Sequence, residues 1–133
     1  MDKPMRDYTD KDSDYIEKAL LDEGFTLEQM TYKTDQTFIT DVGFFSYRVE
    51  NRYPRLVHFY LDKKNRGAGA FRKLSHALWE KMIEKKHLFC VLELPKEKPY
   101  LKRFIKYYGG KDPFCEKDGD KFYYIPTFGR IRG

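Results

Sequence analysis

The feature that most constrains the fold is a strand, a glycine-bearing turn, a long helix and a second strand in succession over residues 55–94. Val57, Phe59 and Leu61 alternate along one face of the first expected strand, residues 55–62. Residues 67–86 place apolar side chains at helical spacing, and residues 87–94 form a nearly continuous apolar run, as in a strand buried on both faces. This order predicts a parallel strand pair joined by a right-handed helical crossover.

The rest of the chain predicts mainly antiparallel strands and short helices, bounded by glycine, proline and capping residues. In chain order we expect an edge strand at 4–8, helices at 13–23 and 26–29, strands at 37–42 and 44–49, a helix at 99–108, and hairpin strands at 113–116 and 121–125. The Asp118-Gly119 dipeptide is a strong hairpin signal. The strands before the long helix indicate an antiparallel meander.

The composition favours one packed domain. A chain of 133 residues has a common single-domain length, and 41% hydrophobic with 17% aromatic residues is more than disordered chains contain. No repeat, low-complexity tract or linker divides the sequence, so we expect a single domain over residues 1–133. The expected class is α/β of the α+β kind, with a mixed, mostly antiparallel central sheet flanked by helices and one parallel strand pair.

Several partner classes are disfavoured by the sequence. No segment approaches the roughly 18 apolar residues of a membrane span, and the first residues lack the apolar stretch of a secretory signal, so we expect a cytoplasmic protein without a membrane partner. Cys90 and Cys115 are expected as free thiols, and no His or Cys spacing predicts a metal site. The net charge of +5 is spread along the chain, which fits an anionic ligand and makes nucleic acid an unfavoured partner without excluding it.

The turn over residues 65–70, Asn-Arg-Gly-Ala-Gly-Ala, is the best candidate for chemistry. Backbone N–H groups at a helix N-terminus attract anions, and Gly67 and Gly69 carry no Cβ to keep a ligand at a distance. No Gly-Lys-Ser/Thr follows, and the third glycine of a dinucleotide fingerprint is absent. The turn predicts a diphosphate site. The alternative is a tight connection whose glycines bind nothing and whose neighbouring cations only face solvent, namely Lys63, Lys64, Arg66, Arg72 and Lys73.

This order of elements resembles the GCN5-related N-acetyltransferase (GNAT) family from about Met5 to Ile125. The family signature is Gln/Arg-x-x-Gly-x-Gly/Ala, and residues 66–71 supply the Arg and the fixed Gly but place Phe71 at the final small position. The resemblance implies a sheet with a splayed cleft at the parallel pair, acetyl-CoA as acyl donor and direct acyl transfer to an amine. The cofactor-binding residues that it implies are Phe59, Tyr60, Leu61, Arg66, Gly67, Ala68, Gly69, Ala70 and Phe71.

The catalytic residues are less clearly marked. Many family members carry an Asn-Pro at the next helix and, seven residues after the Asn, a Tyr that protonates the leaving thiolate; the corresponding residues here are Lys98-Pro99 and Ile105. Tyr100, Tyr107 and Tyr108 on or near the same helix are candidate substitutes, and the alternative is that they are packing or surface residues. For the general base, the candidates are His58 and Glu93, each with a structural alternative.

Three functions follow as hypotheses. The first is an acyl-CoA-dependent N-acyltransferase, above all an N-acetyltransferase, acting on an unidentified amine. The second is a catalytically inactive GNAT-like binding or interaction protein, such as a phage-encoded one, which Phe71 and Ile105 favour. The third is a basic nucleic-acid binder that uses exposed aromatic residues of the sheet. A homodimer through the C-terminal strands, as in relatives of the family, is left open.

Overall fold

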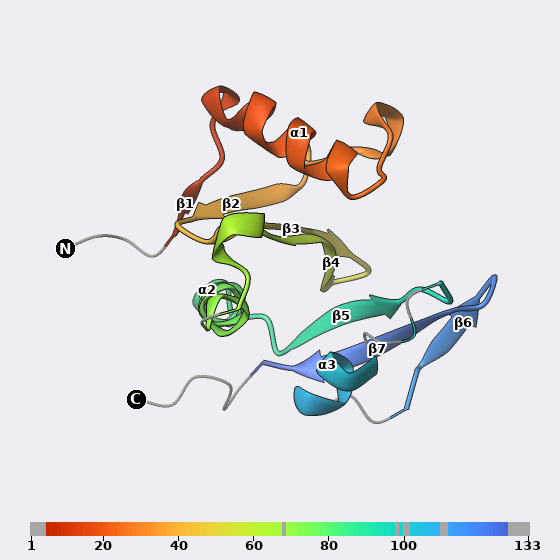
Figure 1. Ribbon diagram of the computed structural model, residues 1–133. Helices are drawn as coiled ribbons and strands as arrows, with labels where there is room; N and C mark the ends of the chain where they lie inside the picture. The colour runs from red at the N-terminus through yellow and green to blue at the C-terminus, as the bar shows by residue number, and fades with distance from the viewer. Residues whose placement is uncertain (1–4, 68, 98, 100–101, 110–111, 128–133) are drawn as a thin grey trace. The chain divides into compact units, whose positions relative to one another are not determined.

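The computed structural model describes residues 5–67, 69–97, 99, 102–109 and 112–127. Its strands form one mixed seven-stranded sheet in the order β1-β2-β3-β4-β5-β7-β6 (Figure 1). The strands are β1 (Met5–Asp7), β2 (Gln36–Thr40), β3 (Gly43–Glu50), β4 (Tyr53–Leu61), β5 (Phe89–Leu94), β6 (Cys115–Lys117) and β7 (Asp120–Pro126). The helices are α1 (Ser13–Asp22), α2 (Ala70–Glu84) and α3 (Lys102–Tyr107), with short 3-10 turns η1 (Asp10–Asp12), η2 (Leu27–Gln29) and η3 (Lys63–Asn65). The expected mixed sheet with flanking helices is confirmed.

The chain divides into two compact units. The first contains residues 1–48 and 57–77, and the second contains residues 49–56 and 78–133. Strand β4 and helix α2 each contribute residues to both units. The single domain expected over residues 1–133 stays a prediction.

In the first unit, α1 packs on the antiparallel strands (Figure 1). The edge strand β1 pairs with β2, and β2 pairs with β3, so that Phe38 lies opposite Phe45. The apolar stripe of α1 meets residues of β2, β3 and β4, and Phe44 stacks on Tyr60 with ring centroids 5.4 Å apart. This core consists of Ile16, Ala19, Leu20, Tyr32, Ile39, Phe44 and Tyr60.

The second unit contains the predicted parallel pair and the predicted hairpin. Strands β4 and β5 run parallel, with Arg55 opposite Val91. Strand β7 pairs antiparallel with β5, and the β6–β7 hairpin turns through Asp118 and Gly119, at φ angles of 54° and 90°. These positive φ angles are what an Asp-Gly hairpin turn requires. Both predictions are confirmed.

Element ends differ from expectation where the backbone leaves the helical region. Helix α2 begins at Ala70 and not at Gly67, because Gly67 and Gly69 have φ angles of 93° and 82°. It ends at Glu84, and Lys86 follows with a φ of 62°. None of the described helices is long and apolar enough to span a membrane.

Candidate functional site

The glycine turn of the first unit is open above both of its described glycines. The Ala70 N–H donates to the Gly67 carbonyl over 2.8 Å, and the Lys73 N–H donates to the Gly69 carbonyl over 3.0 Å, which is the first α-helical bond of α2. A methyl group on Gly67 or Gly69 would meet no atom within 4 Å. Ala68, which is also expected to bind the cofactor, lies outside the described residues. The turn therefore combines accessible backbone with the positive end of a helix dipole.

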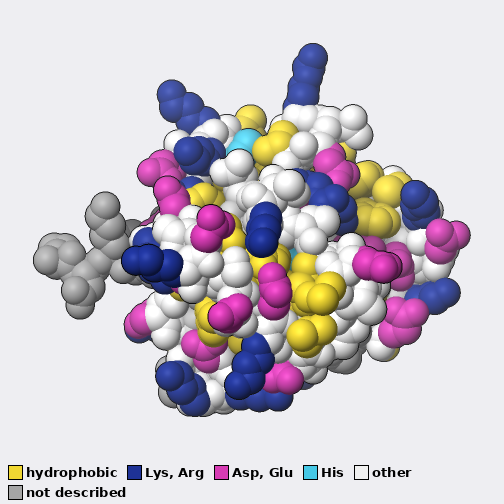
Figure 2. All heavy atoms as spheres, turned by 90° about the horizontal axis from the view of Figure 1, so that it is seen from above, with side chains coloured by type: hydrophobic (Ala, Val, Ile, Leu, Met, Phe, Trp, Pro, Cys, Tyr) yellow, Lys and Arg dark blue, Asp and Glu magenta, His cyan; other side chains and the backbone are white. Residues whose placement is uncertain are grey.

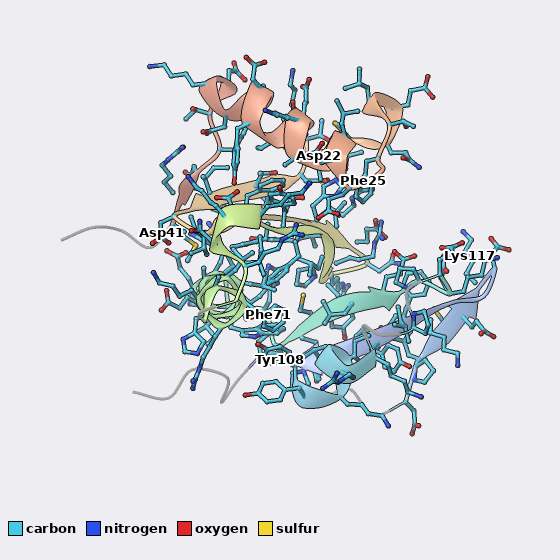
Figure 3. All side chains as sticks on the ribbon, in the orientation of Figure 1. Asp22, Phe25, Asp41, Phe71, Tyr108 and Lys117 are labelled. Atoms are coloured by element: carbon cyan, nitrogen blue, oxygen red, sulfur yellow. The ribbon has the colours of Figure 1, made fainter. Side chains whose placement is uncertain are left out.

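Phe71 does not fill this turn. The ring of Phe71, which is labelled in Figure 3, packs edge-on against Phe59 of β4, with centroids 5.6 Å apart and planes at 62°. The bulky residue at the small position of the motif is thus accommodated by an aromatic neighbour, and the space above Gly67 and Gly69 stays open. The departure from the family pattern at Phe71 therefore does not close the site.

Arg66 anchors the turn within the first unit. Its Nε donates to the Leu61 carbonyl over 2.9 Å, and its Nη2 donates to Glu23 at the end of α1 over 2.8 Å. The guanidinium also lies 5.4 Å from the centre of the Tyr60 ring. We therefore interpret Arg66 as a residue that fixes the path of the turn, in addition to adding positive charge beside it.

The charges around the turn are partly balanced. The Lys63 ammonium lies 3.6 Å from the Asp22 carboxylate, and the Lys73 ammonium lies 3.1 Å from the Asp41 carboxylate. Both ion pairs are exposed to solvent, so each contributes little stability, and each lysine readily exchanges its carboxylate partner for another anion. On the face that carries α1, basic and acidic side chains are interspersed (Figure 2).

His58 lies deep in the first unit. It is 4% exposed, its ring meets Phe25 at 90° with centroids 4.9 Å apart, and neither ring nitrogen has a hydrogen-bond partner among the described residues. Burial lowers its pKa; nearby Asp35 opposes this shift and Arg48 adds to it. His58 is therefore a neutral imidazole at neutral pH, with no described neighbour to pass a proton to.

Glu93 has the electrostatics of a proton acceptor in the second unit. Burial raises its pKa, Asp120 raises it further through its charge and a hydrogen bond, and Arg55 opposes the shift. The Lys96 N–H donates to Asp120 over 2.9 Å, which fixes this carboxylate, and Arg55 pairs with Glu50 over 3.1 Å. A carboxylate with a raised pKa accepts a proton more readily near neutral pH.

Tyr107, the last residue of α3, and Tyr108, which follows it, differ in their surroundings, and Tyr100 lies outside the described residues. Tyr107 is 75% exposed, whereas Tyr108 packs on Trp79 with centroids 5.4 Å apart. Ile105, at the position of the family's acid, is 3% exposed and belongs to the core. Of the two tyrosines, only the Tyr107 side chain is largely exposed to solvent.

The cysteines and acidic groups add no further site. Cys90 and Cys115 are free thiols, as expected, and burial raises the pKa of Cys90 to about 12. Among the described residues, no three His, Cys, Asp or Glu side chains gather closely enough to hold a metal ion.

Comparison with solved structures identifies the fold. An acetyltransferase of the GNAT family from Staphylococcus aureus matches with a TM-score of 0.72 and 16% identity, over 92% of this chain and 98% of that chain. Ard1 from Thermoplasma volcanium matches with a TM-score of 0.69 and 18% identity, over 92% and 95% of the two chains. This chain has the GNAT fold.

A third GNAT-fold protein, the N-acetyltransferase YhbS from Escherichia coli, was crystallised in complex with CoA. It matches with a TM-score of 0.60 and 16% identity, over 92% of this chain and 80% of that chain. No protein-family model and no curated protein matches the sequence. The resemblance to the GNAT family is thus confirmed at the level of the fold.

Sequence reasoning missed two features of the candidate sites. It did not identify Asp120 as the partner of Glu93, although Asp120 closes the hairpin turn that the sequence predicts. It also did not connect Arg66 with Glu23, which is 43 residues away. Both contacts depend on tertiary structure, and no local pattern marks them.

Proposed function

We propose that the protein is an acyl-CoA-dependent N-acyltransferase, specifically an N-acetyltransferase, whose Gly67–Gly69 turn binds the diphosphate of the acyl donor. The observation that carries this proposal is the open space above both positive-φ glycines at the start of α2, in a chain with the GNAT fold. The CoA complex of the structural relative YhbS supports acetyl-CoA as the donor. The donor supplies a thioester, and the chain supplies binding, orientation and proton transfer.

The binding role falls mainly on backbone. The N–H groups of Gly67 and Gly69 lie at the start of α2, where a helix dipole favours negative charge. Arg66 holds this turn through Leu61 and Glu23, so its replacement would change the shape of the turn as well as its charge. Of the residues on β4, Tyr60 is buried in the core, so its ring is not available to a donor.

The catalytic role is best assigned to Glu93. An amine must be neutral to attack a thioester, so the acceptor has to lose a proton. Glu93 is half-buried and its pKa is raised, whereas His58 is closed off behind Phe25. For protonating the leaving thiolate we favour Tyr107 over Tyr108, because Tyr107 is exposed whereas Tyr108 packs on Trp79.

Calorimetry with acetyl-CoA tests the binding proposal. The intact protein should bind with micromolar affinity, and Gly69→Glu, which sets a carboxylate at the phosphate position, should lower the affinity by at least about 100-fold. Gly67→Ala tests the turn, and Gly24→Ala is its control. The two glycines have φ angles of 93° and 94°, and a methyl group on either would meet no atom within 4 Å. Gly67→Ala should weaken binding and Gly24→Ala should not. An intact protein that binds no acetyl-CoA contradicts the proposal.

One observation favours a second candidate function, a GNAT-fold binding protein without catalysis. Ile105 is buried in the core at the position where many family members carry the catalytic tyrosine. An inactive protein would show no release of CoA with any amine and no loss of function in Glu93→Gln. Binding of acetyl-CoA combined with turnover that Glu93→Gln abolishes would exclude this alternative.

A further inference from the structure

Five aromatic side chains gather on one face of the sheet in the second unit, and we call this the aromatic face. Tyr124 is at its centre, with ring centroids 4.0 Å from Phe114, 5.1 Å from Tyr53 and 6.0 Å from Phe89. Phe122 continues the group, 6.5 Å from Phe114. The face draws on β4, β5 and β7 and on the residue before β6, so it is a product of the folded sheet and not of one segment.

The strand register explains why these rings share a face. Tyr124 lies opposite Val91, and Val91 lies opposite Arg55, so alternate residues of β4, β5 and β7 point the same way. The intervening residues of β7, Tyr123 and Ile125, are 3% and 0% exposed. The core therefore lies on their side of the sheet.

The aromatic face is exposed to solvent. Tyr53, Phe114 and Tyr124 are 38%, 44% and 39% exposed. A contiguous exposed apolar patch of this kind marks an interaction site, because leaving it in water is unfavourable. The flat rings also offer π-faces, which attract both other rings and cations.

A pair of carboxyl groups adjoins these rings. Glu93 lies directly opposite Phe122 on the same face, and Asp120, two residues before Phe122 on β7, points to that face as well. Asp120 is held by the Lys96 N–H over 2.9 Å, so its position is fixed. Arg55, the basic residue of this face on β4, is paired with Glu50 over 3.1 Å. The charge that this edge offers to a ligand is therefore negative, which complements a cation.

We propose that the aromatic face binds a protonated primary amine carried on an aromatic or apolar group, with the ring of the ligand against Tyr124 and its ammonium group at Glu93 and Asp120. This inference rests on the proposed function and gives the class of acceptor that the enzyme would use. The rings select ligands that carry an aromatic or apolar group, and the carboxyl pair selects ligands that carry a positive charge.

Titration with three small probes tests this proposal on the full chain. We expect 2-phenylethylamine to bind about tenfold more tightly than 3-phenylpropanoate, which reverses the charge, and than butylamine, which lacks the ring. The shifted amide signals should be those of β5 and β7. Equal binding of 2-phenylethylamine and 3-phenylpropanoate would overturn the proposal.

Matched variants locate the site. Tyr124→Ala and Glu93→Gln should each weaken 2-phenylethylamine binding about tenfold. Leu27→Ala, at an exposed apolar residue of the first unit, and Glu116→Gln, on the other face of the hairpin, should not change it. Tyr124→Phe keeps the ring and should bind like the parent, which guards against a loss caused by unfolding.

Two further measurements exclude other occupants. Light scattering should show the same mass for the parent and for Tyr124→Ala; a dimer that this substitution dissolves would assign the face to a second copy and overturn the proposal. An RNA shift abolished by Tyr124→Ala would overturn it as well. Acetyl-CoA calorimetry is independent of these outcomes, so failure of the aromatic-face proposal and failure of the proposed function can be told apart.

Discussion

Gly43 gives the sharpest stability prediction, because it lies where β3 passes close to β4. A methyl group on Gly43 would lie 1.9 Å from the Tyr60 carbonyl oxygen and 2.9 Å from its carbon. These are backbone atoms and cannot rotate aside. Gly24 is the natural control, since it has a φ of 94° and a methyl group there would meet no atom within 4 Å.

The magnitude follows from the displacement that the clash requires. A carbon and a carbonyl oxygen approach to about 3.3 Å, so the strands must separate locally by more than an ångström. The Asp62 N–H bond to Val42 (2.9 Å) and the Gly43 N–H bond to Thr40 (3.1 Å) would stretch beyond hydrogen-bond range. Each costs about 1 kcal/mol, and disturbed packing between β3 and β4 adds a comparable amount, about 3 kcal/mol in all.

Urea unfolding followed by far-UV circular dichroism measures the difference. Gly43→Ala should lower the free energy of unfolding by about 3 kcal/mol, and Gly24→Ala by only about 1 kcal/mol, the cost of an alanine at positive φ. Equal destabilisation by the two substitutions would refute the reasoning, because it would mean that β3 and β4 do not approach each other at Gly43.

The other stability predictions concern charge and burial. Arg6 bonds Asp12 over 2.7 Å and lowers the pKa of Asp12 to about 2, below the unfolded value of about 4. The stability that this ion pair contributes is therefore lost as the pH falls from 4 to 2. Arg6→Ala should lower the free energy of unfolding by about 1 kcal/mol at pH 7 and should make the urea midpoint less dependent on pH between 4 and 2. Burial lowers the pKa of His58 below the unfolded value of about 6.5, so the protein should lose stability as the pH falls from 7 to 5, and His58→Phe should reduce that loss. Ile105→Ala should cost about 2–4 kcal/mol, whereas Tyr107→Ala should change the free energy of unfolding by less than about 0.5 kcal/mol; thermal melts distinguish them.

The elements predicted well from sequence are those set by local chemistry. The Asp118-Gly119 turn adopts the positive φ angles that its sequence favours, and the hairpin forms around it. The apolar run from Phe89 forms a strand inside the sheet, paired with β4 on one side and β7 on the other. The predicted start of α2 lies three residues before the observed one. The sequence pattern of a helix does not exclude Gly67 and Gly69, whereas their positive φ angles do.

The place of the glycine turn in the fold follows from residues adjacent in sequence, so it could be predicted, whereas its role in binding stays a prediction. Whether the His58 ring nitrogens or the Glu93 carboxylate lie beside a polar side chain depends instead on the strand register. Val91 must lie opposite both Arg55 and Tyr124 before Glu93 can be placed on the aromatic face, and no segment of the sequence contains that information.

A pH profile offers the most direct decision between an enzyme and a binding protein. With acetyl-CoA and 2-phenylethylamine, release of CoA should rise with pH through the pKa of Glu93, because the carboxylate form accepts the proton of the amine. Glu93→Gln should remove that inflection while acetyl-CoA still binds. Asp120→Asn should move it to lower pH, because Asp120 raises the pKa of Glu93. An inflection that stays in place in Asp120→Asn would assign the titration to another group, and Glu93 would then not be the base.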